Sequence, residues 1–424
     1  MVVALLVAAL GGAIFVMRYP VITGARPFDF DINWVAARRL VDGAPLYAAH
    51  SSRVEAISLV GPFMRNAFRS PYSSYIGAPV VALVHTPFLA PAHDDAVAIF
   101  RVVAWIGSVV AVGVAALTLP ARSRLPGGLI GIGALLMSWS LASTLSMGQA
   151  NELVMLAYAF ALVGVARQKW PMVGIALGVA SVLKLAPVFL VLYLVVRGRR
   201  SVLGWAVGSA GAVSVAAAAV GRPSDTWTWL RHVLPGASHG TLYFGNQSLT
   251  GWIGRLVSPV TELTSNWDLG SIRYVSWIFI FGCGLALWRL TRRHAVQPLE
   301  LGLGMLVVLL AGPLSWDHYF VWAFVPLVVL LDPAVWRRSG IREQCAWCAG
   351  LTTAVVLLAI RPTMPSAVEV AADPLTRLYT SPSSLAVLIL VVVAFRQVAV
   401  ATAGARDVVS TGHEGSQRHA LVPA

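Results

Sequence analysis

The chain is long, apolar and basic, and these properties exclude most classes of protein before any motif is considered. Its 424 residues are 58% hydrophobic and only 12% charged, with a formal net charge of +13. The mean hydropathy is +0.76, and a soluble domain carries about twice this share of charged residues. The composition therefore predicts an all-α polytopic membrane protein.

The basic residues are almost all arginines, and Lys169 and Lys184 are the two lysines of the sequence. A nucleic-acid-binding protein would gather its basic residues on one face. Here they lie in short connectors between apolar segments, as the positive-inside rule describes for cytoplasmic loops. We expect a lipid bilayer around the chain and no nucleic-acid partner. The connectors contain Arg122 and Arg124; Arg167 and Lys169; Arg197, Arg199 and Arg200; Arg289, Arg292 and Arg293; Arg337, Arg338 and Arg342; and Arg396.

The first apolar segment, Val2 to Met17, is slightly short for a membrane span. It has no basic N-terminal region, which favours a transmembrane helix with a missing start over a signal peptide. Residues 18–94 follow as a long first extracytoplasmic loop, whose arginines count little because long loops obey the charge rule weakly. Its apolar part, Ile76 to Leu89, contains two prolines and predicts a re-entrant or interfacial hairpin.

If every basic connector is cytoplasmic, the chain must cross the membrane an even number of times between consecutive connectors. This parity predicts about twelve transmembrane helices in a single domain, residues 1–398, with a second extracytoplasmic loop at 222–270. The polar segment 399–424 is expected to be a disordered cytoplasmic tail. After the first segment, the expected spans are 96–119, 127–143, 151–166, 171–186, 187–197, 201–220, 271–289, 298–312, 319–332, 344–360 and 384–398.

Residues 27–47 place two carboxylates beside the membrane in a chain where acids are scarce. Gly43 is placed to end a helix and Asp31 to cap one, with Asp29 just ahead of its start. Asp31 can be a cap or a substrate contact, whereas Asp29 has no clear structural role and is the candidate for chemistry. The stretch predicts a short amphipathic helix at the membrane surface, with four apolar side chains on one face: Ile32, Val35, Ala36 and Leu40.

Parity also places the polar clusters together, on the side opposite the basic connectors. Five separate segments are therefore expected to converge on one outward-facing site. They are Asp29 with Asp31, Met147 to Glu152, Lys184, Phe244 to Ser248 with Arg255, and Gly312 to Tyr319.

Each of these polar residues has a structural alternative. Lys184 lies in an apolar run, where an uncompensated charge costs about 2.5 to 3.5 kcal/mol; it can contact an anion or reach back to the interface. Gln149 and Asn151 flank a turn between two spans and can bind a ligand or satisfy free helix ends. His318 can donate to a phosphate or belong to the interfacial belt.

Asn246 and Gln247 follow an aromatic pair, Tyr243 and Phe244. Aromatic faces beside amide and hydroxyl groups suit a sugar, although aromatic residues also mark membrane interfaces. The three cysteines lie in apolar stretches, and the CxxC pair among them lacks the companion ligands that zinc requires. They are interpreted as packing residues, Cys283, Cys345 and Cys348, and no metal site is predicted.

The order of the motifs resembles one known family. An aspartate after the first span precedes a helix ending Asp-Gly-Ala-Pro-Leu-Tyr, followed by GQ-x-N, K-x-x-P, GNQS and P-x-S-W-D-H-Y. This series, from about residue 27 to about 331, is similar to the polyprenyl-phosphate-sugar-dependent GT-C membrane glycosyltransferases of family 87, found in actinobacteria. The resemblance implies a GT-C-like helix bundle with amphipathic helices in the first extracytoplasmic loop.

The resemblance also implies an activity. A sugar, most often mannose in an alpha linkage and in some members arabinofuranose, moves from a polyprenyl-phosphate donor to a cell-envelope glycolipid or polysaccharide. The active site would face the outer side of the plasma membrane. The family's general base matches Asp29 and its histidine matches His318, whereas its tyrosine-proline cluster is spread here over Tyr72, Tyr75 and Pro79. The expected substrate-binding residues are Asp31, Tyr72, Gln149, Asn151, Lys184, Asn246, Gln247, Arg255, Trp316 and Tyr319.

This chemistry suits the residues present. An attacking hydroxyl needs a carboxylate to accept its proton, and the departing phosphate needs cationic or hydrogen-bonding partners. A lipid-phosphate donor needs no nucleotide pocket, and the sequence offers no paired-acid metal box beyond Asp29 and Asp31. We therefore expect no cofactor and a metal-independent reaction, in which a single displacement inverts the anomeric configuration. The competing class is a secondary transporter or lipid flippase, but the two halves show no internal repeat, and a transporter does not need its polar clusters on one face.

Overall fold

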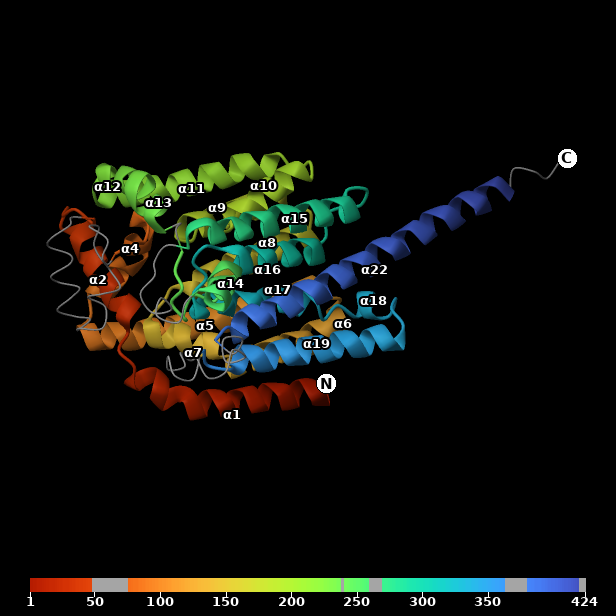
Figure 1. The fold of residues 1–424 in the computed structure, drawn as a ribbon, viewed down its shortest axis with the longest axis horizontal. Helices are drawn as coiled ribbons and strands as arrows, with labels where there is room; N and C mark the ends of the chain where they lie inside the picture. The colour runs from red at the N-terminus through yellow and green to blue at the C-terminus, as the bar shows by residue number, and fades with distance from the viewer. Residues whose placement is uncertain (48–74, 238–239, 259–268, 363–379, 419–424) are drawn as a thin grey trace.

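The computed structural model describes residues 1–47, 75–237, 240–258, 269–362 and 380–418, with the backbone alone described beyond residue 403. In these ranges the chain is a bundle of helices packed side by side (Figure 1). The first helices are α1 (Val2–Gly24), α2 (Phe28–Val41), α4 (Pro79–His85), the 3-10 helix η2 (Thr86–Leu89), α5 (His93–Ala115), η3 (Ala116–Thr118), α6 (Ala121–Met137), α7 (Trp139–Met147), α8 (Asn151–Ala166), α9 (Trp170–Leu183) and α10 (Val188–Val196).

The second half begins with the long helix α11 and ends with α22, which projects beyond the rest of the bundle (Figure 1). Its elements are α11 (Ser201–Val220), α12 (Pro223–Thr228), the π-helix η4 (Trp229–Val233), α13 (Leu234–Ala237), α14 (Leu249–Val257), η6 (Gly270–Arg273), α15 (Tyr274–Thr291), α16 (Pro298–Ala311), η7 (Asp317–Ala323), α17 (Phe324–Val329), α18 (Pro333–Trp336), α19 (Ile341–Ala359) and α22 (Pro382–Arg418).

Five of the described helical segments are long and apolar enough to cross a membrane, and a sixth span results if α6 and α7, bent by 62°, are one broken span. This confirms a multi-pass membrane protein. The remaining apolar helices have 10 to 17 residues, so length and composition do not confirm the predicted number of about twelve. The five segments are Val2–Gly24, His93–Thr118, Ser201–Val220, Gly270–Thr291 and Pro382–Ala403.

The first helix continues past the predicted Met17 to Gly24, which places Arg18 inside the span. Arg18 donates to the carbonyl of Met137 at 2.5 Å and to that of Ala359 at 2.7 Å. These residues end α6 and α19, and the last carbonyls of a helix lack partners within it. Arg18 therefore satisfies two helix ends and holds α1 against the bend between α6 and α7.

The predicted amphipathic helix is present as α2, but its predicted start is wrong. The helix begins at Phe28, so Asp29 lies inside its first turn and Asp31 does not cap it. Both carboxylates are compatible with this position because the helix dipole favours negative charge near an N-terminus. Gly43 has φ +65, as a residue that ends a helix requires. The apolar face packs as predicted, with Ile32, Ala36 and Leu40 all buried.

Two further segments differ from the prediction. Residues 79–89 form one short helical segment, α4 followed by η2, instead of a hairpin; Pro79 stands in the first turn, where its missing N–H has no consequence. The tail expected to be disordered continues the helix α22 to Arg418. Its alanine-rich start, free of proline, allows the helix to propagate from the span before it.

The short helices of the predicted loops 18–94 and 222–270 and the basic connector that follows α18 lie at different ends of the bundle. Figure 1 shows α2, α4, α12 and α13 together at one end, while α18 and the start of α1 lie towards the other. Of the cysteines, Cys283 is partly buried, and Cys345 and Cys348 are exposed on α19. The end that carries α2 is also the end where the polar side chains gather.

Candidate active site

A cavity of about 1570 Å³ opens beside α2, α7 and the junction between α9 and α10. Residues from the end of α1, from α15 and from the loops at 243–245 and 312–316 complete its wall. Four of the five predicted polar segments reach it with residues chosen from the sequence. These residues are Asp29, Gln149, Lys184, Trp316, His318 and Tyr319.

The bend between α6 and α7 turns a short helix into this wall. The bend stands at Ser138, whose hydroxyl accepts the backbone N–H of Leu141 at 3.1 Å and so caps α7. The helix ends at Gly148, which has φ +72. Its Cα lies against Phe30 of α2, leaving no room for a side chain. The tight turn brings Gln149 into the cavity.

Lys184 lies where α9 ends, in an extended conformation ahead of Pro187. Its ammonium donates to the Gln149 side-chain oxygen at 3.2 Å and to the Tyr319 hydroxyl at 2.7 Å. The same nitrogen lies 4.2 Å from the centre of the Tyr319 ring, a distance typical of a cation–π contact. The lysine therefore points into the cavity and does not reach back to the interface.

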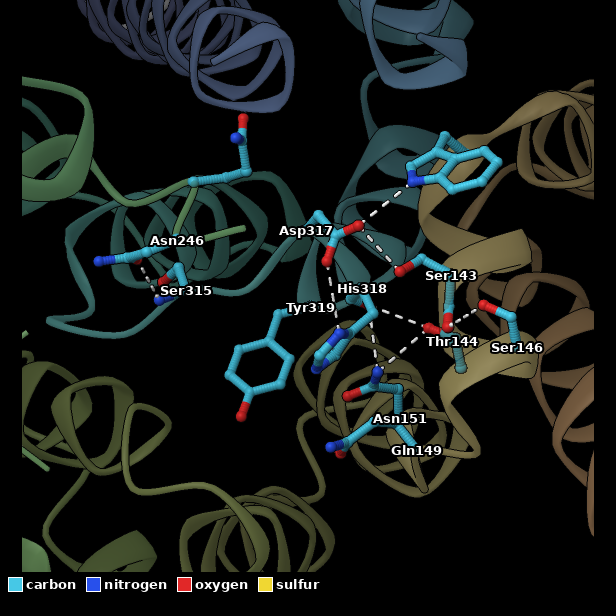
Figure 2. A network of polar contacts seen from close by, with 12 residues as sticks. Ser143, Thr144, Ser146, Gln149, Asn151, Asn246, Ser315, Asp317, His318 and Tyr319 are labelled. Carbon is cyan, nitrogen blue, oxygen red and sulfur yellow. Dashed lines mark hydrogen bonds and ion pairs between the residues drawn. The ribbon is translucent and has the colours of Figure 1, made fainter. Parts of the chain in front are cut away.

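Asp317 is the centre of the polar network that Figure 2 shows. One carboxylate oxygen accepts from the Trp139 indole at 3.2 Å and the Ser143 hydroxyl at 2.8 Å. The other lies 3.5 Å from His318 Nδ1. Burial opposes ionisation, but interactions with His318, Ser143 and Trp139 outweigh it and hold the pKa of Asp317 below its ordinary value.

His318 is held at both its ring and its backbone. Its carbonyl accepts from the Thr144 hydroxyl at 3.0 Å and the Asn151 amide at 3.1 Å, while Asp317 faces Nδ1 (Figure 2). The side chain lines the cavity, and its Nε2 is buried with no hydrogen-bond partner among the described residues. A buried polar atom normally has a partner, and a group bound in the cavity could reach Nε2.

Asp29 lines the same cavity from the first turn of α2. Burial raises the pKa of its carboxyl group above the ordinary value. The charges of His318 and Lys184 and a hydrogen bond from the Gln149 side chain act in the opposite direction, and the charge of Asp317 adds to the increase. Asp29 therefore interacts with His318, Lys184 and Asp317 and is suited to take up a proton.

Two predicted sugar-binding residues, Asn246 and Gln247, do not line the cavity. The Asn246 side chain is fully buried and bonds four backbone groups, those of Thr241, Ser248, Pro313 and Ser315. Gln247 donates to the carbonyls of Phe244 and Thr380. Their loop forms a β-bridge, Asn246 with Trp316, and both amides are used to hold loops together.

Three other predicted contacts are also structural. The guanidinium of Arg255, in α14, is buried and donates to the carbonyls of Tyr243 and Asn246 in the preceding loop and to the hydroxyls of Thr380 and Ser381. Asp31 pairs with Arg26 at 3.2 Å and with His93 at 3.0 Å.

Asn151 donates to Thr144 and accepts from the Trp322 indole, as well as holding the carbonyl of His318. It satisfies groups at the start of α8, the structural alternative considered for it. Tyr72 lies outside the described residues.

Three residues of the polar network beside His318 were not predicted from the sequence. Asp317 was within a quoted motif but was not chosen, although its position beside a histidine was a usable signal. Trp139 and Ser143 carry no sequence signal, because their role depends on the bend before α7. Within the described ranges, no group of three or more His, Cys, Asp or Glu side chains is placed to hold a metal ion.

The helices and the cavity together define a multi-pass membrane protein with an internal polar site built around two carboxylates, a lysine and a histidine. The model of glycosyltransferase family 87 matches residues 75–314. The chain therefore belongs to glycosyltransferase family 87, which confirms the family predicted from its motifs.

Three relatives have similar sequences. The chain is 28% identical over 347 residues to a polyprenol-phosphate-mannose-dependent alpha-(1-2)-phosphatidylinositol mannoside mannosyltransferase of Mycobacterium tuberculosis, covering 76% of this chain and 74% of the relative. A protein of the same description from Mycolicibacterium smegmatis is 29% identical over 51% of this chain and 48% of its own length. A corresponding pentamannoside mannosyltransferase of Mycobacterium tuberculosis is 31% identical over 48% of this chain and 45% of its own length.

Proposed function

We propose that this glycosyltransferase moves mannose from a polyprenyl-phosphate donor to a hydroxyl group of a cell-envelope glycolipid, with inversion to an alpha linkage. The descriptions of the relatives support the donor, the sugar and a glycolipid acceptor. One structural observation carries the proposal: Asp29, Lys184 and His318 come from distant segments and line one cavity.

In the proposed reaction, the acceptor oxygen forms a bond to the anomeric carbon while the bond from that carbon to the phosphate oxygen breaks. The departing lipid phosphate keeps the bonding electron pair. Asp29 accepts the proton of the attacking hydroxyl, because a carboxylate beside the hydroxyl lowers the barrier to its attack. A single displacement inverts the configuration, so a β-linked donor gives an α-linked product.

Lys184 and His318 are proposed to bind the phosphate as its charge grows. Lys184 carries a fixed positive charge, and Asp317 faces His318 Nδ1 so that Nε2 meets the cavity. In its imidazolium form, Nε2 can donate to a phosphate oxygen, and a donor aimed at developing charge stabilises the transition state. We propose that these two side chains supply the positive charge without a metal ion.

The proposed topology is about twelve transmembrane helices in the plasma membrane, with the cavity on the extracytoplasmic side. Arginines follow α10 and α18 in the sequence. Figure 1 places α18 away from the end that carries α2 and α12. Basic connectors are normally cytoplasmic, and this arrangement supports an outer position for Asp29.

The test is an incubation of the purified full-length protein with radiolabelled polyprenyl-phosphate mannose and, separately, polyprenyl-phosphate arabinose, using membrane lipid extract as acceptor. Wild-type protein should transfer mannose to lipid, and Asp29→Asn should not. Transfer of arabinose alone would assign the chain to the arabinofuranosyl branch. Failure of both donors in folded protein would overturn the proposed function.

A further inference from the structure

The cavity contains a cation for which the proposed reaction has no use. Arg361 follows the end of α19, lines the cavity and is exposed. Its guanidinium lies 5.0 Å from the centre of the Trp139 ring. Within the described part of the chain, the guanidinium makes no hydrogen bond or ion pair. Stacking on an aromatic face leaves the edge of a guanidinium free, and this edge can bind two oxygens of one phosphate at once.

A continuous series of side-chain contacts connects Arg361 to Lys184 along the cavity wall. The Trp139 indole donates to Asp317, which faces the ring of His318. The His318 ring packs edge-on against Tyr319, with ring centres 4.8 Å apart, and Tyr319 accepts from Lys184. The order along the wall is therefore Arg361, Trp139, Asp317, His318, Tyr319 and Lys184.

In this series of contacts, the carboxylate of Asp317 lies between Arg361 and Lys184. Asp317 accepts from the indole of Trp139, the ring that Arg361 faces, while contacts through His318 and Tyr319 connect this carboxylate to Lys184. Two anions could therefore be bound on either side of Asp317 without sharing a partner. The proposed donor has one phosphate, which leaves from the side where Lys184 and His318 lie.

We propose that Arg361 binds a second phosphate group, the phosphodiester of an anionic, lipid-anchored acceptor. This inference rests on the proposed function. Arg361 would hold the headgroup of the acceptor while its sugar hydroxyl lies near Asp29, and Lys184 would hold the donor phosphate. The guanidinium suits this role better than an ammonium because its planar donors match two phosphate oxygens.

The test compares two acceptors that end in the same mannoside: one anchored through a phosphatidylinositol-type phosphodiester, the other through an uncharged alkyl chain. Full-length protein is assayed in uncharged detergent with polyprenyl-phosphate mannose. Arg361→Gln should raise KM for the anionic acceptor about 10- to 100-fold, the usual effect of losing a hydrogen bond to a charged group. KM for the uncharged acceptor and for the donor should change less than about twofold, and Arg361→Lys should be intermediate.

Arg292→Gln is the matched control, because Arg292 stacks on Trp288 at a similar distance, 5.2 Å, and does not line the cavity. It should leave every KM unchanged, and Lys184→Gln should raise KM for the donor. Equal effects of Arg361→Gln on both acceptors, no effect on either, or an increase confined to the donor would each overturn the inference. Thermal unfolding checks that all variants are folded.

A binding measurement separates failure of this inference from failure of the proposed function. Each acceptor is titrated into wild-type protein and Arg361→Gln without donor, so that no transfer is needed. Wild-type protein should bind the anionic acceptor at least about 10-fold more tightly than the variant does. Binding that does not differ between the two proteins would overturn the Arg361 site even if mannose transfer is observed.

Discussion

At the scale of single residues, the cavity takes its chemical character from a few ionisable side chains, and three of them could be chosen from the sequence. Asp29, Lys184 and His318 were identifiable from the sequence, because a charged or titratable group in an apolar chain is expensive and therefore informative. The structural role of the buried amides Asn246 and Gln247 could not be identified in this way. A sequence cannot distinguish an amide that faces a ligand from one that bonds loop carbonyls, and the fully buried Asn246 is the second kind.

The two carboxylates of α2 should respond differently to mutation. Asp29→Asn should reduce turnover about 100- to 10,000-fold, the usual contribution of proton transfer, while donor binding stays nearly intact. Asp31→Asn should reduce activity less and stability more, because Asp31 is buried between Arg26 and His93. Both variants are compared in one membrane assay with thermal unfolding. A dead Asp31→Asn beside a normal Asp29→Asn would assign the base to the other carboxylate, and activity in both would contradict the mechanism.

The pH dependence should show the environment of Asp29. Burial raises the pKa of this carboxyl group, and a base works only while ionised. The rate should therefore fall, as pH decreases, at a higher pH than the ordinary aspartate value of about 3.9. Lys184 lowers the pKa of Asp29, so Lys184→Gln should move the acid limb of kcat further up in pH. A limb that moves down, or does not move, would show that Lys184 does not act on the base.

At the scale of elements, the site depends on two loops that meet from distant parts of the chain. The N–H of Gln247 donates to the carbonyl of Ser315 at 2.7 Å, and the N–H of Asp317 donates to that of Gly245 at 2.9 Å. This pairing holds Asp317 and His318 against α7. The apolar segments predicted the main helices because hydrophobic length is a local property. The pairing joins residues far apart in the chain. The sequence therefore showed the two motifs, at 245–247 and 315–317, but not that they contact each other.

Asn246 should therefore contribute mainly to stability, and to activity only through the loops that it holds. Asn246→Ala would leave four backbone groups without their side-chain partner. Each unsatisfied buried group costs about 1 to 3 kcal/mol, so a marked decrease in the unfolding temperature and a loss of kcat are expected. Gln168→Ala is the control, because its side chain donates to one carbonyl only. A stable Asn246→Ala that binds donor poorly would restore the ligand-binding role predicted from sequence.

At the scale of the whole molecule, the cavity residues and the basic connector after α18 lie in different parts of the bundle. Helices α2 and α4, which contribute residues to the cavity, lie at one end of the bundle together with α12 and α13. Helix α18 lies away from this end (Figure 1). The sequence predicted this separation from parity alone. It also divided short spans at Pro187, and several apolar helices are shorter than a membrane span. It did not predict the bend at Ser138, inside the expected span 127–143, because the apolar character continues across this position.

The two ends of α11 provide a test of orientation. Ser201 starts this helix beside the arginines of residues 197–200, and Ser224 lies just beyond its end, in α12; both side chains are exposed. Ser201→Cys and Ser224→Cys are made separately after Cys283, Cys345 and Cys348 are replaced by alanine. If basic connectors are cytoplasmic, a membrane-impermeant maleimide added to intact cells should label Ser224→Cys and not Ser201→Cys. Permeabilised cells should allow labelling of both, which shows that each thiol is reactive. Labelling of Ser201→Cys alone in intact cells would place Asp29 on the cytoplasmic side, and labelling of both there would mean that α11 does not cross the membrane.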